Sequence, residues 1–267
     1  MPDKPILIDG IDREWLEEQA SRDPIVHAYS LWDFLHFPEK AKFVTLSRGG
    51  HPKGYLLMWI PSTGIPSVHW ISRDPDDDLL LTALPQRPLT VFAPERVAKK
   101  VLAVRGPAKV SQVDMMEHHG DVRLLRPTSI EVRRLNGGDR KIFDELLANA
   151  DRPLSDGMKN VDLDHHMIWG AFEGERLASI VQASVTLPIA WMLNAVWTGP
   201  EFRGKGYCKA VVTAATRAGL ETGAKVGLYV FADNLPAYRA YERVGFRMIE
   251  RQSIIDANEE QRPDNTL

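Results

Sequence analysis

The run from Arg203 to Cys208 has residue types and a spacing that suggest anion binding. It follows a strand-like apolar stretch, residues 191–197, and precedes residues 207–220, where apolar side chains recur at helical spacing. Its glycines let successive backbone N–H groups converge where a Cβ would interfere. The helix then begins with unpaired N–H groups and the positive end of its dipole facing outward. We therefore expect a socket for an anion such as a diphosphate.

A second strand–helix unit follows, and it offers a phenol. Residues 226–231 are rich in strand formers, and Asn234 with Pro236 is typical of a helix start. A short helix over 237–244, ended by Gly245, places Tyr241 seven residues after Asn234. Such a phenol can donate a proton to a leaving group, although most tyrosines on short helices only pack. The two units should frame a cleft at one edge of a sheet.

Taken together, the two blocks resemble the GNAT acyltransferase superfamily. Residues 196–208 are similar to its pyrophosphate-binding signature, Gln/Arg-x-x-Gly-x-Gly/Ala, and residues 234–246 to its Asn-to-Tyr helix. Either block alone is weak, because glycine-rich turns are common. Both in order, at the usual separation, make the resemblance specific.

The resemblance implies acyl-coenzyme A, most often acetyl-CoA, as co-substrate, with no metal. Backbone groups of residues 196–198 would pair with its pantetheine arm, and the loop 203–208 would hold its diphosphate. Tyr241 would protonate the departing thiolate, and Tyr238 would pack against the cofactor or a neighbouring strand. The full set of implied cofactor contacts is Val196, Trp197, Thr198, Arg203, Gly204, Lys205, Gly206, Tyr207, Cys208, Lys209, Asn234 and Tyr238.

The sequence departs from the superfamily pattern at two positions. Cys208 stands where glycine or alanine is usual, but cysteine is small, so we expect binding to survive. A helix N-terminus favours thiolates, yet a bound cofactor would cover Cys208, which argues against a nucleophile there. Asn194 stands where many members carry a glutamate as general base. An amide does not accept a proton at neutral pH, so the motif leaves the base unassigned.

These features favour an N-acyltransferase that transfers the acyl group by direct attack of a primary amine, most simply of a small molecule, in a ternary complex. The missing glutamate keeps open a non-catalytic acyl-CoA sensor. A mononucleotide-binding Rossmann-type domain is a weaker alternative, since the loop is not Gly-x-Gly-x-x-Gly and no acidic ribose-binding residue follows. The acceptor, the acyl chain length and the oligomeric state, monomer or homodimer, stay open.

The composition indicates the cellular compartment and gives no support for nucleic-acid or membrane partners. The 267 residues are 44% hydrophobic and 26% charged, as in ordinary globular proteins. A net charge of -3 gives no electrostatic argument for nucleic acid or for an anionic membrane. A single cysteine suits a reducing compartment, and no apolar run approaches the roughly 18 residues that span a bilayer. The start of the chain lacks the apolar core of a signal peptide. We expect a cytoplasmic protein.

Two units are expected, residues 1–126 and 127–267, with Pro127 at the boundary. The second is expected as a catalytic GNAT domain with a mixed α/β sheet and helices on both faces. The first alternates helices over 11–37, broken at Asp23-Pro24, with later strands and a helix over 94–101. It resembles a degenerate GNAT half without the diphosphate loop, in a tandem layout similar to glycine N-acyltransferase-like proteins. The alternative is an unrelated α/β domain that shapes the acceptor pocket.

Two charged clusters have simpler explanations than chemistry. The acidic run from Asp74 to Asp78 is most simply a solvated turn before a helix near Leu79. Asp162, Asp164, His165 and His166 include metal-ligand types, but the adjacent histidines would point to opposite faces of a strand. We expect no metal there, and at most one of these groups lining the acceptor pocket as a base.

Overall fold

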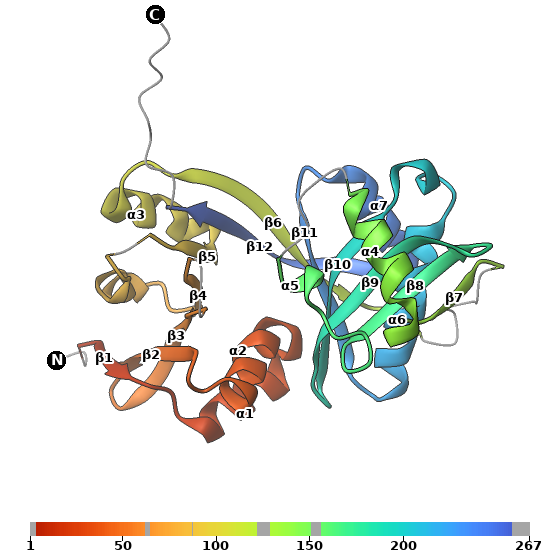
Figure 1. Ribbon diagram of the computed structural model, residues 1–267. Coiled ribbons are helices and arrows are strands. Elements are labelled where there is room, and N and C mark those ends of the chain that lie inside the picture. The colour runs from red at the N-terminus through yellow and green to blue at the C-terminus, as the bar shows by residue number, and fades with distance from the viewer. Residues whose placement is uncertain (1–3, 62–64, 87, 122–128, 151–155, 258–267) are drawn as a thin grey trace, which may run out of the picture.

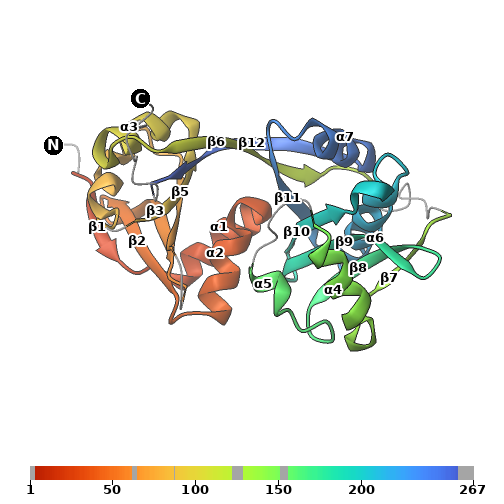
Figure 2. The same ribbon diagram turned by 45° about the horizontal axis from the view of Figure 1, so that its top comes forward.

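The computed structural model describes residues 4–61, 65–86, 88–121, 129–150 and 156–257. Twelve strands form one mixed sheet, and helices cover it, which confirms the expected α/β class. Figures 1 and 2 show two lobes that strands β6 and β12 bridge. We call elements β1 to α3 the N-terminal lobe and elements β7 to α7 the C-terminal lobe.

The N-terminal lobe begins with the expected helix pair, broken at Asp23 because Pro24 opens the second helix. The helix expected near Leu79 is instead a short 3-10 helix that starts at Asp77. The elements of this lobe and the strand after it are β1 (Ile6–Asp9), α1 (Arg13–Arg22), α2 (Pro24–His36), β2 (Ala41–Arg48), β3 (His51–Trp59), β4 (Ser67–Ser72), η1 (Asp77–Ala83), β5 (Thr90–Pro94), α3 (Glu95–Arg105) and β6 (Lys109–His118).

The C-terminal lobe has the expected element order, and its helices lie on both faces of the sheet. A hairpin turns at Gly174, whose positive φ of 62° suits glycine. Its elements and the last strand are β7 (Glu131–Arg134), η3 (Gly137–Asp139), α4 (Arg140–Ala148), α5 (Asp156–Lys159), β8 (Met167–Glu173), β9 (Arg176–Thr186), β10 (Ala190–Thr198), η4 (Pro200–Phe202), α6 (Tyr207–Glu221), β11 (Lys225–Phe231), α7 (Leu235–Val244) and β12 (Phe246–Asp256).

The two lobes repeat one strand arrangement. The sheet order is β1-β2-β3-β4-β5-β12-β6-β11-β10-β9-β8-β7. If each strand is exchanged with its counterpart in the other half (β1 with β7, β2 with β8, and so on), the same order is read from the opposite edge of the sheet. In both lobes the fourth and fifth strands are parallel and their other neighbours antiparallel. The last strand of each half, β6 or β12, lies beside the fifth strand of the other lobe. The boundary expected at residues 126–127 lies outside the described residues.

The lobes also share a core through helix α2. Buried Ile25, Ala28 and Leu31 of α2 pack with Ala190 and Met192 of β10. The approach is close, because a Cβ on Gly227 of β11 would stand only 2.6 Å from Cγ2 of Ile25. Helix α2 therefore covers part of the C-terminal sheet.

Candidate active site

The candidate site of the C-terminal lobe starts where two parallel strands stop pairing. Strands β10 and β11 pair from Ala190 with Lys225 to Leu193 with Leu228, and the recorded pairing stops there. Just beyond, β10 contains a bulge between Asn194 and Trp197. Ala195 in this bulge has φ +48°, the one positive value among described residues other than glycine. Bulges re-aim backbone groups and often border active sites, and such backbone strain clusters there.

The glycine-rich loop lies after this strand and leads into helix α6. Gly204 and Gly206 have φ values of 77° and 93°. A Cβ on Gly204 would meet no atom within 4 Å, so conformation rather than space requires glycine there. Gly206 is the N-cap of the 15-residue helix α6, and no side chain caps it. The exposed loop thus leaves the helix N-terminus open to an anion, as the sequence indicates.

The basic side chains near the loop are partly engaged with the protein itself. Lys205 Nζ lies 3.1 Å from Oε1 of Glu173, and the Tyr207 hydroxyl donates to the same oxygen at 2.9 Å. These contacts hold the pKa of Glu173 below its usual range. Arg203 Nε donates to the Thr198 carbonyl oxygen at 3.2 Å. Tyr207 is buried and supports the loop from below, while Lys205 remains at the surface.

Cys208 lies in the first turn of α6 and is half-buried. Burial raises the pKa of its thiol to about 11. The thiol is therefore protonated at neutral pH, whereas a nucleophilic cysteine needs a thiolate. This agrees with the expectation that Cys208 belongs to the loop and not to the chemistry.

Helix α7 is built as the Asn-to-Tyr spacing predicts. Asn234 Oδ1 accepts a hydrogen bond from the Ala237 N–H at 3.4 Å, and Gly245, with φ 115°, ends the helix. Tyr241 is 5% exposed, and its ring lies edge-on to Phe246 with centroids 6.3 Å apart. Tyr238 is half-buried and packs against the core cluster that includes Tyr241. Burial and then the charge of Asp114 on the bridging strand β6 raise the pKa of its phenol.

A second set of polar groups lies where α2 meets the parting strands. The Tyr29 hydroxyl is 3.3 Å from Oγ of Ser184 on β9, and its ring stacks on Tyr229 of β11 at 6.2 Å. Oδ1 of Asn194 is buried and accepts a hydrogen bond from none of the described residues. Burial raises the pKa of Tyr29, opposed by Ser184 and Asn194 and reinforced by Asp33. Asn194 and Asp33 thus both influence the ionisation of the Tyr29 phenol.

Asp33 follows Tyr29 by one helical turn, on the same side of α2. Burial raises the pKa of its carboxyl to about 7. Neither Tyr29 nor Asp33 is among the site residues predicted from the sequence. The only sequence signal was indirect: Asn194 left the base position without a carboxylate, but nothing local in α2 points to β10.

The cluster around Asp162 is a capped turn. Its carboxylate accepts from the Asp164 N–H at 2.9 Å and contacts Nδ1 of His165 at 2.7 Å, while His166 Nδ1 contacts the Asp162 carbonyl at 2.9 Å. Within the described ranges, no group of three or more His, Cys, Asp or Glu side chains could hold a metal ion.

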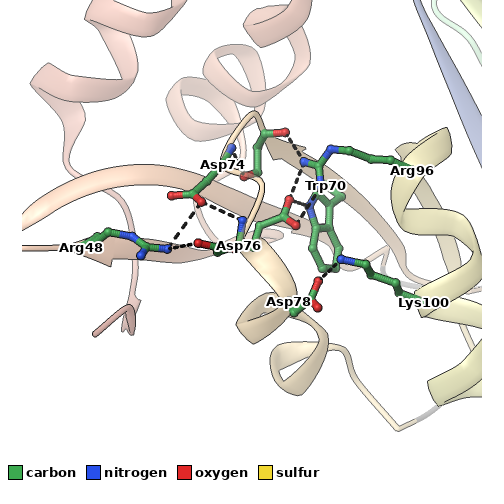
Figure 3. A network of polar contacts seen from close by, with 9 residues as sticks. Arg48, Trp70, Asp74, Asp76, Asp78, Arg96 and Lys100 are labelled. Atoms are coloured by element: carbon green, nitrogen blue, oxygen red, sulfur yellow. Dashed lines mark hydrogen bonds and ion pairs between the residues drawn. The ribbon is translucent and has the colours of Figure 1, made fainter. Parts of the chain in front are cut away.

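In the N-terminal lobe, the place of the glycine-rich loop is filled by an acidic turn (Figure 3). Asp77 is fully buried, accepts from Trp70 Nε1 at 2.8 Å, and binds the Arg96 guanidinium at 2.6 and 2.9 Å. The expectation of a wholly solvated turn is therefore wrong for Asp77. Its neighbours form further ion pairs. Lys100 pairs with Asp78 at the surface, and Arg48 lies 3.5 Å from both the half-buried Asp74 and the exposed Asp76. These carboxylates would repel a diphosphate.

With this geometry in view, the comparisons with known proteins are informative. Residues 140–246 match the model of the Acetyltransferase (GNAT) family. The chain therefore contains a GNAT acetyltransferase domain. The matched range contains the bulged strand, the glycine-rich loop and both helices of the candidate site.

Among curated proteins, a mycothiol acetyltransferase from Corynebacterium aurimucosum is 46% identical over 55 residues. That match covers 20% of this chain, and the chain spans about a fifth (18%) of the relative's length. It supports acyl transfer in general terms and carries no substrate over to this chain.

Solved structures share the fold over nearly the whole chain. A Drosophila protein is similar with a TM-score of 0.70 and 14% identity, covering 96% of this chain and all of that one. A GCN5-related N-acetyltransferase from Sphaerobacter thermophilus is similar with a TM-score of 0.64 and 16% identity, covering 97% of this chain and 98% of that one. A tandem GNAT protein from the clavulanic acid biosynthesis pathway is similar with a TM-score of 0.57 and 13% identity, covering 96% of this chain and 99% of that one. At such identities the likeness concerns the fold alone.

No helix in the described part of the chain combines the length and the apolar character needed to cross a membrane.

Proposed function

We propose that this chain transfers an acetyl group from acetyl-CoA to a primary amine by direct attack in a ternary complex. One observation carries the proposal. The open N-terminus of α6, entered through Gly204 and Gly206 in positive φ, lies at the end of the strand that parts from β11. Backbone N–H groups there suit a diphosphate, and the parted strands offer hydrogen-bonding edges to a pantetheine arm.

The types of residue at the site suit the chemical groups of acetyl-CoA that they would hold. The loop from Arg203 to Cys208 would bind the diphosphate through its N–H groups, with Lys205 and Lys209 at its exposed rim. The bulged segment from Val196 to Thr198 would pair with the arm. Asn234 caps the helix that carries Tyr241, and it would touch the cofactor arm. The cofactor supplies an activated thioester carbon to the site.

In the proposed reaction, the amine nitrogen forms a bond to the thioester carbon and the carbon–sulfur bond breaks. Tyr241 donates its proton to the departing thiolate, which is the general-acid role expected of a phenol at that place. A backbone N–H of the bulged strand would hydrogen-bond to the oxyanion. Holding both reactants in the cleft removes much of the entropic barrier.

The N-terminal half, residues 1–126, is proposed as a degenerate copy of the catalytic half, residues 127–267. The repeated strand order supports this, and so does the loss of the anion socket to the acidic turn at Asp77. The acceptor is proposed to be a small molecule, because α2 occupies the neighbouring face of the sheet. The single cysteine favours a cytoplasmic setting.

The test combines binding with turnover. Calorimetry should show one acetyl-CoA site per chain, and a thiol-release assay with glycine, glucosamine, spermidine and a lysine peptide should show amine-dependent release. Asn194 in place of a carboxylate favours one other candidate, a non-catalytic acyl-CoA sensor. Binding without release with any amine would support the sensor and contradict the enzyme. Absence of binding would contradict both.

A further inference from the structure

The acceptor side of the cleft has polar groups that the GNAT motifs do not account for. Asn194 follows the last residue of β10 paired with β11 and carries a buried Oδ1 without a partner among the described residues. Opposite it stands the Tyr29 hydroxyl, held at 3.3 Å by Ser184 Oγ. These groups come from three elements, α2, β9 and β10, at the level where the β10–β11 cleft opens.

Asp33 completes this set from the N-terminal lobe. It lies four residues after Tyr29 on α2, so the two side chains share a face of the helix. After burial, the charge of the Asp33 carboxylate helps to raise the pKa of the Tyr29 phenol. In the part of the chain that the structure describes, no recorded hydrogen bond or ion pair engages that carboxylate. A half-buried carboxylate with this environment needs either a partner or a function.

We propose that Asp33 of the N-terminal lobe is the general base of the acetyl transfer, and that the acceptor amine binds between α2 and the bulged strand β10. The inference rests on the proposed function. The acceptor arrives as an ammonium ion, R-NH3+, and the Asp33 carboxylate takes one of its protons, which leaves the neutral amine that attacks the thioester. Tyr29 and Asn194 contact and orient the acceptor, since β10 carries Asn194 in place of a glutamate side chain.

The surroundings leave Asp33 as the group that titrates. Burial raises its pKa to about 7, so a large share of the carboxyl is ionised at neutral pH, which suits a base. Helix α1 faces α2 with apolar Leu16 and Ala20. The polar groups on or against this part of α2 are Tyr29 and His36 of α2, Ser184 of β9, Asn194 of β10, Tyr229 of β11 and His69 of β4.

Of these neighbours, His69 stays neutral across the working range, because burial lowers its pKa to about 4. Burial raises the pKa values of Tyr29 and Tyr229, so both remain protonated. His36 is exposed, stacks on Trp32 at 3.8 Å and contacts the Trp32 carbonyl through Nδ1. His36 is therefore the other side chain on this part of α2 to replace as a matched control.

The experiment uses the full chain with acetyl-CoA and the fastest of glycine, glucosamine, spermidine and a lysine peptide. Asp33→Asn should lower kcat/KM at pH 7 by 10²-fold or more, while acetyl-CoA affinity by calorimetry stays unchanged. The acid limb of the pH profile, with a midpoint near 7 in the unmodified chain, should disappear. Asp33→Glu should restore part of the rate. His36→Gln should retain both the rate and the acid limb.

Two readouts separate this role from a structural one. Urea unfolding at pH 8 should show Asp33→Asn at least as stable as the unmodified chain. Carbon-13 NMR of aspartate carboxyls should show one signal titrating near pH 7 that is missing from Asp33→Asn. Thiol release by Asp33→Asn at the unmodified rate and with the same acid limb would overturn the base assignment alone. Lack of thiol release by the unmodified chain with all four amines would overturn the proposed function together with it.

Discussion

The hydroxyl of Tyr29 on α2 lies 3.3 Å from the hydroxyl of Ser184 on β9, although 155 residues separate them in the chain. The contact joins a helix of the N-terminal lobe to the sheet of the C-terminal lobe. In the proposed reaction, the N-terminal lobe therefore contributes side chains to the face on which the acceptor would bind.

The Tyr29–Ser184 contact should be measurable as a coupling. Tyr29→Phe and Ser184→Ala each remove one half of a partly buried hydrogen bond, and a neutral bond of this kind is worth about 1 kcal/mol net. In urea unfolding, the double variant should therefore lose less stability than the two single losses added, by about 0.5–1 kcal/mol. Strict additivity would mean that the two hydroxyls do not interact in solution.

The substitution Tyr241→Phe tests whether the Tyr241 phenol is the general acid. Loss of a general acid costs about 10²-fold or more in turnover, whereas the ring still fills its place beside Phe246. We expect kcat in the thiol-release assay to fall by that factor while acetyl-CoA affinity by calorimetry changes little. Tyr55→Phe, which removes a buried hydroxyl from β3 in the other lobe, should leave kcat unchanged. Full turnover by Tyr241→Phe would remove the phenol from the mechanism.

Gly206→Asp tests the anion socket, and the chain supplies a matched control. The substitution puts a negative charge where the diphosphate would lie and forces a side chain onto φ +93°. Acetyl-CoA binding in calorimetry should be abolished. Gly223 has φ +87°, also with open space around it, but follows the other end of α6. Gly223→Asp imposes similar strain without the charge at the socket and should bind normally. Equal loss in both variants would point to strain and not to the socket.

The buried Asp77–Arg96 ion pair in the acidic turn of the N-terminal lobe should contribute strongly to the free energy of unfolding. Arg96→Met leaves the fully buried Asp77 carboxylate with Trp70 but without its cation, which should cost about 2–4 kcal/mol in urea unfolding. Lys100→Met breaks the neighbouring pair with Asp78, whose side chains are 39% and 60% exposed. That change should cost about 1 kcal/mol or less. A similar small loss in both variants would show that Asp77 does not depend on Arg96.

The parts of the site that the sequence predicts are those whose signals are local. Gly204 and Gly206 predict positive φ before a helix, and Asn234 predicts a helix cap. Each of these residues determines the backbone conformation of only a few neighbouring residues. The same holds for the break at Pro24. These determinants need no knowledge of the tertiary structure.

The features that were missed depend on distant partners. Alternation identifies β6 and β12 as strands, but it does not tell which lobe each of them joins, and here they are exchanged. Asp33 is an ordinary polar residue until α2 packs against β10. Ala195 lies in the bulge of β10 against β9, and no glycine at this position marks its positive φ in the sequence.

Buried titratable groups give a final prediction on stability and pH. Burial lowers the pKa values of His27 and His69 to about 4, so the folded chain binds fewer protons than the unfolded chain between pH 4 and 6.5. Their contribution is full above pH 6.5 and is lost as the pH falls to 4, by up to about 3 kcal/mol each. Asp33 acts in the opposite direction, since its raised pKa favours the folded chain at low pH.

Urea unfolding at pH 4.5, 5.5, 6.5 and 7.5 separates the two effects. His69→Phe should flatten the loss of stability below pH 6.5, because the ring that must stay neutral is gone while its stacking on Phe92 is kept. Asp33→Asn should steepen that loss, because the opposing carboxyl is removed. The two variants should thus deviate from the unmodified chain with opposite sign, and a common slope for all three would show that neither group titrates as its burial requires.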